Sequence, residues 1–238
     1  MTRRRAAAAI LAVVLVGSVA AGAWAVTAGP LAGAPRPVVP RFVEETATAG
    51  VAITYDGTLP YFTGGGVAAF DCDGDGRQDL YVAGGANPAG LFRNESPVAG
   101  ALRFSQIHAP ETDLRAVTGA YPIDIDGDGI VDLAVLRNGG NDLLRGLGDC
   151  RFENANERWA FDGGDASTMA FAATWEGDAT LPTLAFGNYV DPGRTDPNSL
   201  CDDNVLLRPA ADGRTFGPGQ ALSPGLCALS LLFSDWSR

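Results

Sequence analysis

Apolar residues in this chain occur in short runs, and glycine or proline interrupts every one of them beyond the N-terminus. The runs LYVAGG (80–85) and LAVLRNGG (133–140), for example, are rich in strand-forming residues and end in glycine. Short runs bounded by turn residues favour β-strands over long helices. The pattern predicts an all-β fold.

Two nine-residue loops interrupt this pattern with clustered aspartates, DCDGDGRQD (71–79, loop 1) and DIDGDGIVD (124–132, loop 2). Carboxylates at positions 1, 3, 5 and 9, with glycine at position 6 for a sharp turn, can point into one hollow, where the carbonyl of position 7 can join them. Oxygen ligands in a flexible ring suit Ca²⁺. The predicted ligands of two structural Ca²⁺ ions are Asp71, Asp73, Asp75, Asp79 and the Arg77 carbonyl in loop 1, and Asp124, Asp126, Asp128, Asp132 and the Ile130 carbonyl in loop 2.

The two loops differ from an EF-hand, which needs a bidentate glutamate at position 12 and flanking helices. Position 12 is Val82 in one case and Val135 in the other, each inside a strand-like run. We therefore expect each loop to join two strands of a β-hairpin. The alternative is a solvated acidic turn without metal, which the identical ligand spacing of two loops disfavours.

The surroundings of the loops recur as well. An apolar strand precedes each loop, and a strand, an L-x-R element, a turn and a phenylalanine follow it. The L-x-R arginines are Arg93, Arg145 and Arg208, and the phenylalanines are Phe104, Phe152 and Phe216. Four short strands in a repeat of about 50 residues are the signature of a β-propeller blade.

The later copies of the repeat depart from this pattern. In TWEGDATLPT (174–183, loop 3), Thr174 takes position 1, so that Glu176 and Asp178 alone would hold an ion weakly. ALSLLF (228–233) would be the first strand of a fourth copy, which has only begun at the last residue. Because propellers generally need four to eight blades, we expect three blades and a stub to belong to a longer ring or to be completed by a partner.

These motifs carry a family resemblance over about residues 41–238. GGGVAAFDCDGDGRQDLYVAGG (64–85) and the L-x-R elements resemble the FG-GAP/VCBS-type repeats of integrin-α-like propellers. FGNYVDP (186–192), CDDNVLLRP (201–209) and LLFSDWSR (231–238) are similar to segments of bacterial relatives of cartilage acidic protein. The resemblance implies a seven-bladed, calcium-stiffened extracellular propeller with adhesive or undefined roles. Loop 3 departs from the family pattern.

Four cysteines in an exported chain suggest two disulfides, for which three connectivities exist. In a four-stranded blade the first and third turns lie on one face of the ring, and the other connections lie on the opposite face. By their places in the repeat, Cys72 and Cys150 belong to one face, whereas Cys201 and Cys227 belong to the other. The pairing Cys72–Cys150 with Cys201–Cys227 therefore keeps each bond on one face. It requires the Cys72 side chain to point out of loop 1.

The first 25 residues have the layout of a secretory signal peptide. Three arginines precede an apolar run, which ends in the cleavage-type motif Ala23-Trp24-Ala25. The alternative is an uncleaved membrane anchor, because residues 6–28 carry no charge and are just long enough to span. Residues 26–40 are expected to form a Pro/Ala/Gly-rich linker, and residues 41–238 a propeller that is truncated at its C-terminus.

Charge and composition exclude several functions. The net charge is −11, and loss of the three arginines of the signal peptide, which holds no acidic residue, would change it to −14. Such a surface repels nucleic acid and anionic lipid. With His108 as the single histidine and no C-x-x-C-H motif or phosphate-cradling glycine loop, the chain lacks the usual residues of zinc, triad, haem or nucleotide sites.

We therefore expect a secreted, periplasmic or cell-surface binding module of the adhesion type, which contacts an extracellular protein or polysaccharide. A membrane would be involved only through an uncleaved N-terminus. The alternatives are a docking scaffold for other proteins and a propeller-based lyase or hydrolase of polysaccharide or phosphoester, with Ca²⁺ as Lewis acid. Groups considered for such catalysis are His108, Glu176, Asp178, Tyr189 and Asp191. Each has a simpler structural explanation, so no catalytic residue is assigned.

Overall fold

The computed structural model of the protein describes residues 39–191, 200–222 and 224–235. The predicted signal peptide and nearly all of the predicted linker lie outside these residues, as do residues 192–199 of the long insertion in the third repeat. Residues 1–44 and 45–238 form separate units, and all strands belong to the second. From residue 39 onward, two short helical segments, α2 (Thr46–Ala49) and the 3₁₀ turn η1 (Tyr61–Thr63), precede the first strand.

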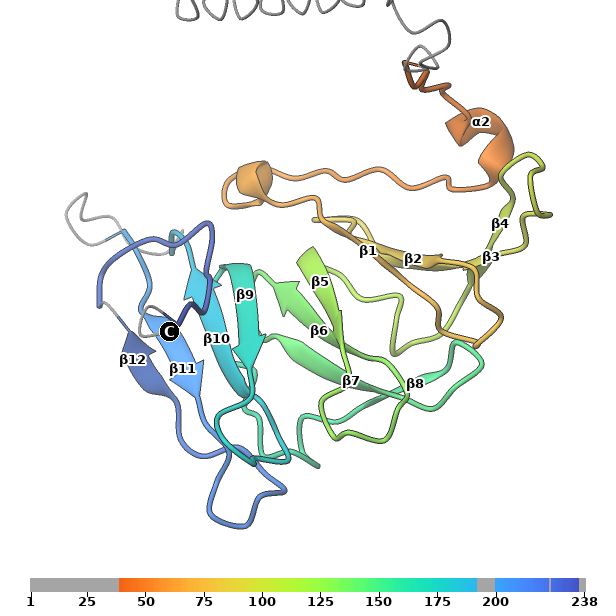
Figure 1. The fold of residues 1–238 in the computed structure, drawn as a ribbon. Helices are drawn as coiled ribbons and strands as arrows, with labels where there is room; N and C mark the ends of the chain where they lie inside the picture. Colours follow the sequence, from red (N-terminus) through yellow and green to blue (C-terminus); the bar gives the residue numbers. More distant parts are fainter. Residues whose placement is uncertain (1–38, 192–199, 223, 236–238) are drawn as a thin grey trace, which may run out of the picture. The chain divides into compact units, whose positions relative to one another are not determined.

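Three four-stranded antiparallel sheets make up the second unit (Figure 1). Blade 1 consists of β1 (Val67–Phe70), β2 (Asp79–Val82), β3 (Gly90–Asn94) and β4 (Phe104–Ile107). Blade 2 consists of β5 (Val117–Ile123), β6 (Asp132–Arg137), β7 (Asp142–Gly146) and β8 (Phe152–Asn154). Blade 3 consists of β9 (Thr168–Thr174), β10 (Thr183–Asn188), β11 (Asn204–Leu207) and β12 (Gln220–Leu222). Each strand pairs with the next one along the chain, which confirms the predicted all-β fold of propeller blades.

The hydrophobic cores lie between the blades rather than within them. The first strands of the blades neighbour one another, β1 against β5 and β5 against β9 (Figure 1). One core joins residues of blades 1 and 2, including Tyr81 and Leu144. A second core joins blades 2 and 3 and includes Trp159 and Phe186. Face-to-face packing of successive sheets is the arrangement by which propeller blades bury both of their surfaces.

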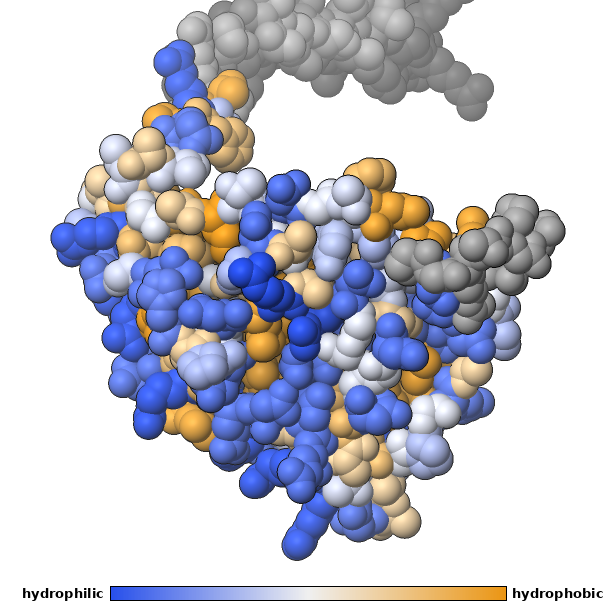
Figure 2. All heavy atoms as spheres, turned by 180° about the vertical axis from the view of Figure 1, so that it is seen from behind, coloured by the Kyte–Doolittle hydropathy of each residue, from blue (hydrophilic) through white to orange (hydrophobic). Residues whose placement is uncertain are grey.

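The burial of each second strand follows from this arrangement. In β6 of the middle blade, five successive residues from Asp132 are buried, because a sheet covers each face. In β2 of blade 1, buried and half-buried residues alternate, as in a strand with one covered face. The second strand of a blade is therefore buried continuously where a sheet covers each face, as in β6, and in alternation where one face is covered, as in β2. On the face shown in Figure 2, the surface is mainly hydrophilic, with apolar residues in separate areas.

One strand prediction is wrong. The phenylalanines of the repeat are at their predicted places after the turn, with Phe104 and Phe152 at the start of β4 and β8 and Phe216 in an isolated bridge with Pro209 before β12. Residues 228–233 are not a strand, although the amide of Ala228 donates to the Asn188 carbonyl (2.7 Å). A strand needs a partner, and among the described residues no strand pairs with this segment.

Both predicted disulfides are present. Cys72–Cys150 links blade 1 to blade 2, and Cys201–Cys227 links the insertion after β10 to the segment after β12. Cys72 is buried in the core between blades 1 and 2, so its side chain does point out of loop 1. Disulfides persist in oxidising compartments, and the two bonds indicate such an environment for this protein. Within the described ranges, no helix is long and apolar enough to cross a membrane.

Candidate metal sites

Loops 1 and 2 occupy equivalent places, between the first and second strands of blades 1 and 2. The hairpin ladders end with Phe70 opposite Asp79 and with Ile123 opposite Asp132, which brings the two ends of each loop together. At position 6, Gly76 has φ 84°. This left-handed conformation is available to glycine at little cost, which explains why both loops carry glycine there.

The aspartate at position 1 organises each loop from inside. Asp71 accepts hydrogen bonds from the amides of Gly74 and Gly76, both at 2.8 Å. Asp124 does the same in loop 2, with the amides of Gly127 (2.8 Å) and Gly129 (3.0 Å). Although desolvation acts in the opposite direction, the amide hydrogen bonds lower the pKa of Asp71 below its usual value. Asp71 is therefore held ionised.

The aspartate at position 9 is buried and ties the loop to the rest of its blade. Asp132 has no exposed surface, and it accepts hydrogen bonds from the amides of Ile125 (2.7 Å) and Gly146 (2.8 Å). Burial, opposed by these hydrogen bonds and reinforced by the charges of Asp126 and Asp128, raises the pKa of Asp132 to about 6. A cation beside this group would compensate the cost of its buried charge.

Asp79 holds the same position in loop 1. It is also fully buried, and its partners are the amides of Cys72 and Asn94, both at 2.8 Å. Desolvation is the largest influence on it and raises its pKa, with the charges of Asp73 and Asp75 acting in the same direction. Both loops thus bury an acidic group that has amide partners but, among the residues that the structure describes, no ion pair with a cationic side chain.

Three of the four predicted carboxylates converge in each loop. Those at positions 1, 3 and 9 place ligand oxygens within 4.8 Å of one another, in the groups Asp71, Asp73, Asp79 and Asp124, Asp126, Asp132. In loop 2, the buried Oδ1 of Asp126 has no hydrogen-bond partner. A cluster of hard oxygen donors that includes an unsatisfied buried oxygen fits a divalent cation such as Ca²⁺.

Position 5 faces arginine instead. Asp75 forms an ion pair with Arg77, and Asp128 forms one with Arg145. Each aspartate also accepts the amide of position 7, Arg77 in loop 1 (2.8 Å) and Ile130 in loop 2 (2.9 Å). Coordination of an ion by position 5 would therefore compete with a guanidinium, which the ligand spacing alone did not reveal.

The arginine of each L-x-R element faces position 3 of the loop in its own blade. Arg93 Nε lies 3.2 Å from Asp73 Oδ2, and Arg145 Nε lies 2.8 Å from Asp126 Oδ2. In blade 3, Arg208 Nε lies 3.0 Å from Glu176 Oε1. The sequence showed this arginine only as a marker of the repeat. Because this arginine is present in all three copies of the repeat, the sequence did hold a signal that it interacts with the loops.

Loop 3 replaces the acidic cluster by a neutralised network. Thr183 begins β10 at the place where Asp79 and Asp132 begin β2 and β6. Its hydroxyl donates to Glu176 Oε1 (2.7 Å), the oxygen that also faces Arg208. The Thr183 hydrogen bond, ahead of the Arg208 charge, lowers the pKa of Glu176.

The other acid–base candidates lie in separate surroundings. His108 follows β4, with Nδ1 3.1 Å from Asp113 Oδ2 and a side chain that is 70% exposed. Glu176 belongs to the loop 3 network of blade 3. The amide of Tyr189 donates to the Ser167 carbonyl (2.8 Å), and the amide of Asp191 donates to the Leu200 carbonyl (2.8 Å), both within strand connections.

The three four-stranded antiparallel sheets are blades of the β-propeller type. Residues 71–135 match the model of the FG-GAP-like repeat, from the start of loop 1 into β6. The matched segment thus contains both loops that are candidate metal sites. A search of curated proteins finds no match for this chain.

Proposed function

We propose that this protein is an exported, calcium-stabilised β-propeller, which acts as a binding or adhesion-type module for an extracellular protein or polysaccharide. The observation that carries the proposal is the duplicated convergence of carboxylates from positions 1, 3 and 9 at one end of two neighbouring blades. The signal-type N-terminus, the two disulfides and the FG-GAP-like match support export. The proposed location is secreted, periplasmic or on the cell surface.

The proposed role of Ca²⁺ is structural. The ion would supply positive charge to the buried carboxylates at position 9, because the arginines of the two loops face positions 3 and 5 instead. Asp79 and Asp132 connect each loop to the third strand of its blade through the amides of Asn94 and Gly146, so an ordered loop also orders the blade. At a hundredfold excess over Kd, one ion adds about 2.7 kcal/mol to stability. Extracellular calcium modules typically bind at ~10⁻⁴ to 10⁻³ M.

Thermal unfolding of the purified protein in millimolar Ca²⁺ and in chelator tests the proposal. Calcium should raise the melting temperature. Asp73→Ala and Asp126→Ala should each remove part of the gain, because each deletes one carboxylate of one cluster. The matched control is Asp178→Ala in loop 3, which should leave the gain intact. Coincident melts of a folded protein with and without calcium would exclude structural calcium sites.

A further inference from the structure

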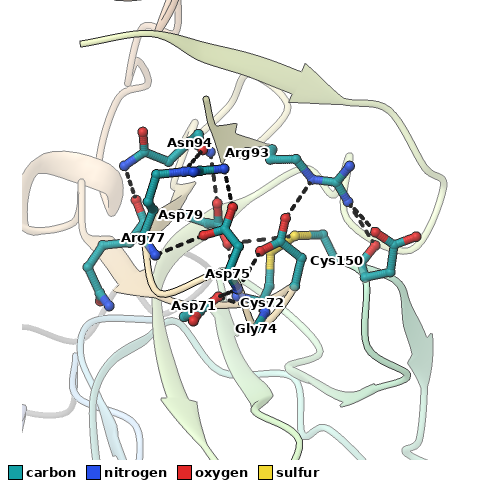
Figure 3. The surroundings of a disulfide bond; sticks show 12 residues. Asp71, Cys72, Gly74, Asp75, Arg77, Asp79, Arg93, Asn94 and Cys150 are labelled. Atoms are coloured by element: carbon teal, nitrogen blue, oxygen red, sulfur yellow. Dashed lines mark hydrogen bonds and ion pairs between the residues drawn. A yellow bond between two sulfur atoms is a disulfide. The ribbon is translucent and has the colours of Figure 1, made fainter. Parts of the chain in front are cut away.

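The two boundaries between blades differ at the end where the loops lie. At the first boundary, the turn between β7 and β8 covers loop 1 (Figure 3). Cys150 forms the disulfide with Cys72 and donates its amide to the Cys72 carbonyl (3.0 Å), and Arg93 Nη2 lies 2.7 Å from Asp149 Oδ1. Loop 1 is thereby closed against its neighbouring blade.

The second boundary stays open. Ile125 takes the position of Cys72 in loop 2, and among the described residues no hydrogen bond, ion pair or disulfide joins loop 2 to the turn between β11 and β12. A groove of about 590 Å³ lies there instead. We call it the arginine groove; its polar side chains are Asp126, Asp128, Arg145, Arg158, Thr180 and Arg214.

The charge of this groove is unusual for so acidic a protein. Its only carboxylates are Asp126 and Asp128, which are predicted calcium ligands and which both pair with Arg145. Arg158 and Arg214 are exposed, and the charge of Arg214 interacts favourably with the neighbouring Asp212 carboxylate. Among the described residues, neither guanidinium group forms a direct ion pair or hydrogen bond. Two exposed guanidinium groups thus line one groove in a chain of net charge −11.

We propose that the arginine groove binds carboxylate groups of an acidic polysaccharide, and that calcium in loop 2 controls this binding. The guanidinium fork matches a carboxylate in two parallel hydrogen bonds. Ca²⁺ takes six to eight oxygen ligands. Loop 2 offers five predicted ligand groups, so a carboxylate of the bound sugar can complete the coordination.

The apolar lining favours a sugar over a protein partner. Binding sites for proteins need aromatic or aliphatic anchors in accessible pockets. The large apolar residues of the groove, Trp159 and Leu181, are only 1% and 2% exposed, because they belong to the core between blades 2 and 3. Besides Asp126 and Asp128, which the proposed ion would neutralise, the groove offers guanidinium groups, a hydroxyl and backbone, which suit a partner with carboxylates and hydroxyls.

Dependence on calcium follows from the charges. Without the ion, Asp126 and Asp128 add negative charge to the groove and engage Arg145. When these carboxylates neutralise a bound ion, the three arginines dominate the field that a ligand meets. This inference rests on the proposed calcium site of loop 2, whereas loop 1 plays no part in it.

Calorimetric titration of the purified protein with trigalacturonate, in calcium and in chelator, tests the inference. We expect binding only in calcium, and binding about tenfold weaker for each arginine removed in Arg158→Ala and Arg214→Ala. The matched control is the double variant Arg103→Ala/Arg151→Ala. It removes as much positive charge as Arg158→Ala and Arg214→Ala together, but from other exposed sites, and should bind like the wild type. A neutral maltotriose probe should not bind.

Thermal melts of the same samples separate the two proposals. The groove variants should keep the full calcium-dependent rise of the melting temperature. If that rise is present but trigalacturonate does not bind, or binds equally to the groove variants, the groove assignment is wrong while structural calcium stands. Tighter binding of a triglutamate peptide would assign the groove to an acidic protein and overturn the polysaccharide proposal. If calcium changes no melt, the proposed function itself fails.

Discussion

The disulfide Cys72–Cys150 should set the calcium affinity of loop 1 as well as the stability of the protein. Cys72 lies between Asp71 and Asp73, its amide donates to Asp79, and its carbonyl accepts from the Cys150 amide. Residues of blade 2 thus fix the backbone of a loop in blade 1 (Figure 3). The perturbation is the double variant Cys72→Ser/Cys150→Ser.

Two magnitudes follow. For the sequence separation of 78 between the cysteines, the loop-entropy relation gives about 4.5 kcal/mol of stabilisation, a large part of the ~5–15 kcal/mol that holds a typical domain folded. Without the bond, the backbone of position 2 must be ordered when the ion binds, which costs about 1–2 kcal/mol. Calcium affinity at loop 1 should therefore fall on the order of tenfold.

The assay isolates each loop in turn. Calorimetric titration with calcium in an Asp126→Ala background reports loop 1, and titration in an Asp73→Ala background reports loop 2. Only loop 1 should weaken when the disulfide is removed, because Ile125 replaces the cysteine in loop 2. The control variant Cys201→Ser/Cys227→Ser removes a bond of 26-residue separation, which costs about 3.5 kcal/mol of stability. It should leave both affinities unchanged. Equal weakening of both loops, or none in a folded variant, refutes the coupling.

Three further perturbations test other parts of the account. The raised pKa of Asp132, about 6, favours folding at acid pH, and this contribution to stability is lost as the pH rises through 6. In chelator, the protein should therefore gain stability relative to Asp132→Asn as the pH falls from about 7.5 to 5.5. The increment in melting temperature from calcium should shrink over the same range. A pH-independent increment in thermal melts contradicts this. Arg145→Gln should increase the increment from calcium, because the guanidinium that competes for Asp126 and Asp128 is gone; a smaller increment contradicts the competition. Trp159→Ala should cost about 3–5 kcal/mol in denaturant unfolding, since it empties the core between blades 2 and 3; a cost below ~1 kcal/mol would refute that packing.

The features that the sequence predicted well are those with local causes. The spacing of glycines and aspartates in residues 71–79 and 124–132 was enough to predict hairpin loops, and the order of strands within a blade was enough to pair the cysteines.

The features that the sequence could not predict depend on contacts between blades. The turn between β7 and β8 contacts loop 1 through Asp149, whereas a groove separates the equivalent turn between β11 and β12 from loop 2. Both features depend on how a turn of one blade packs against a loop of the preceding blade. The pairing of position 5 with arginine arises within a blade, because Arg145 reaches Asp128 from a strand that is adjacent only in the folded blade.

Direct measurement of bound calcium tests the central claim most closely. Equilibrium dialysis of the purified protein against ⁴⁵Ca²⁺ should give two ions per chain, one ion for Asp73→Ala and one for Asp126→Ala, and none for the double variant. The Asp178→Ala variant should still hold two. Absence of saturable binding up to ~10⁻³ M, the weak limit for extracellular calcium modules, would contradict the account, as would a stoichiometry that these substitutions leave unchanged.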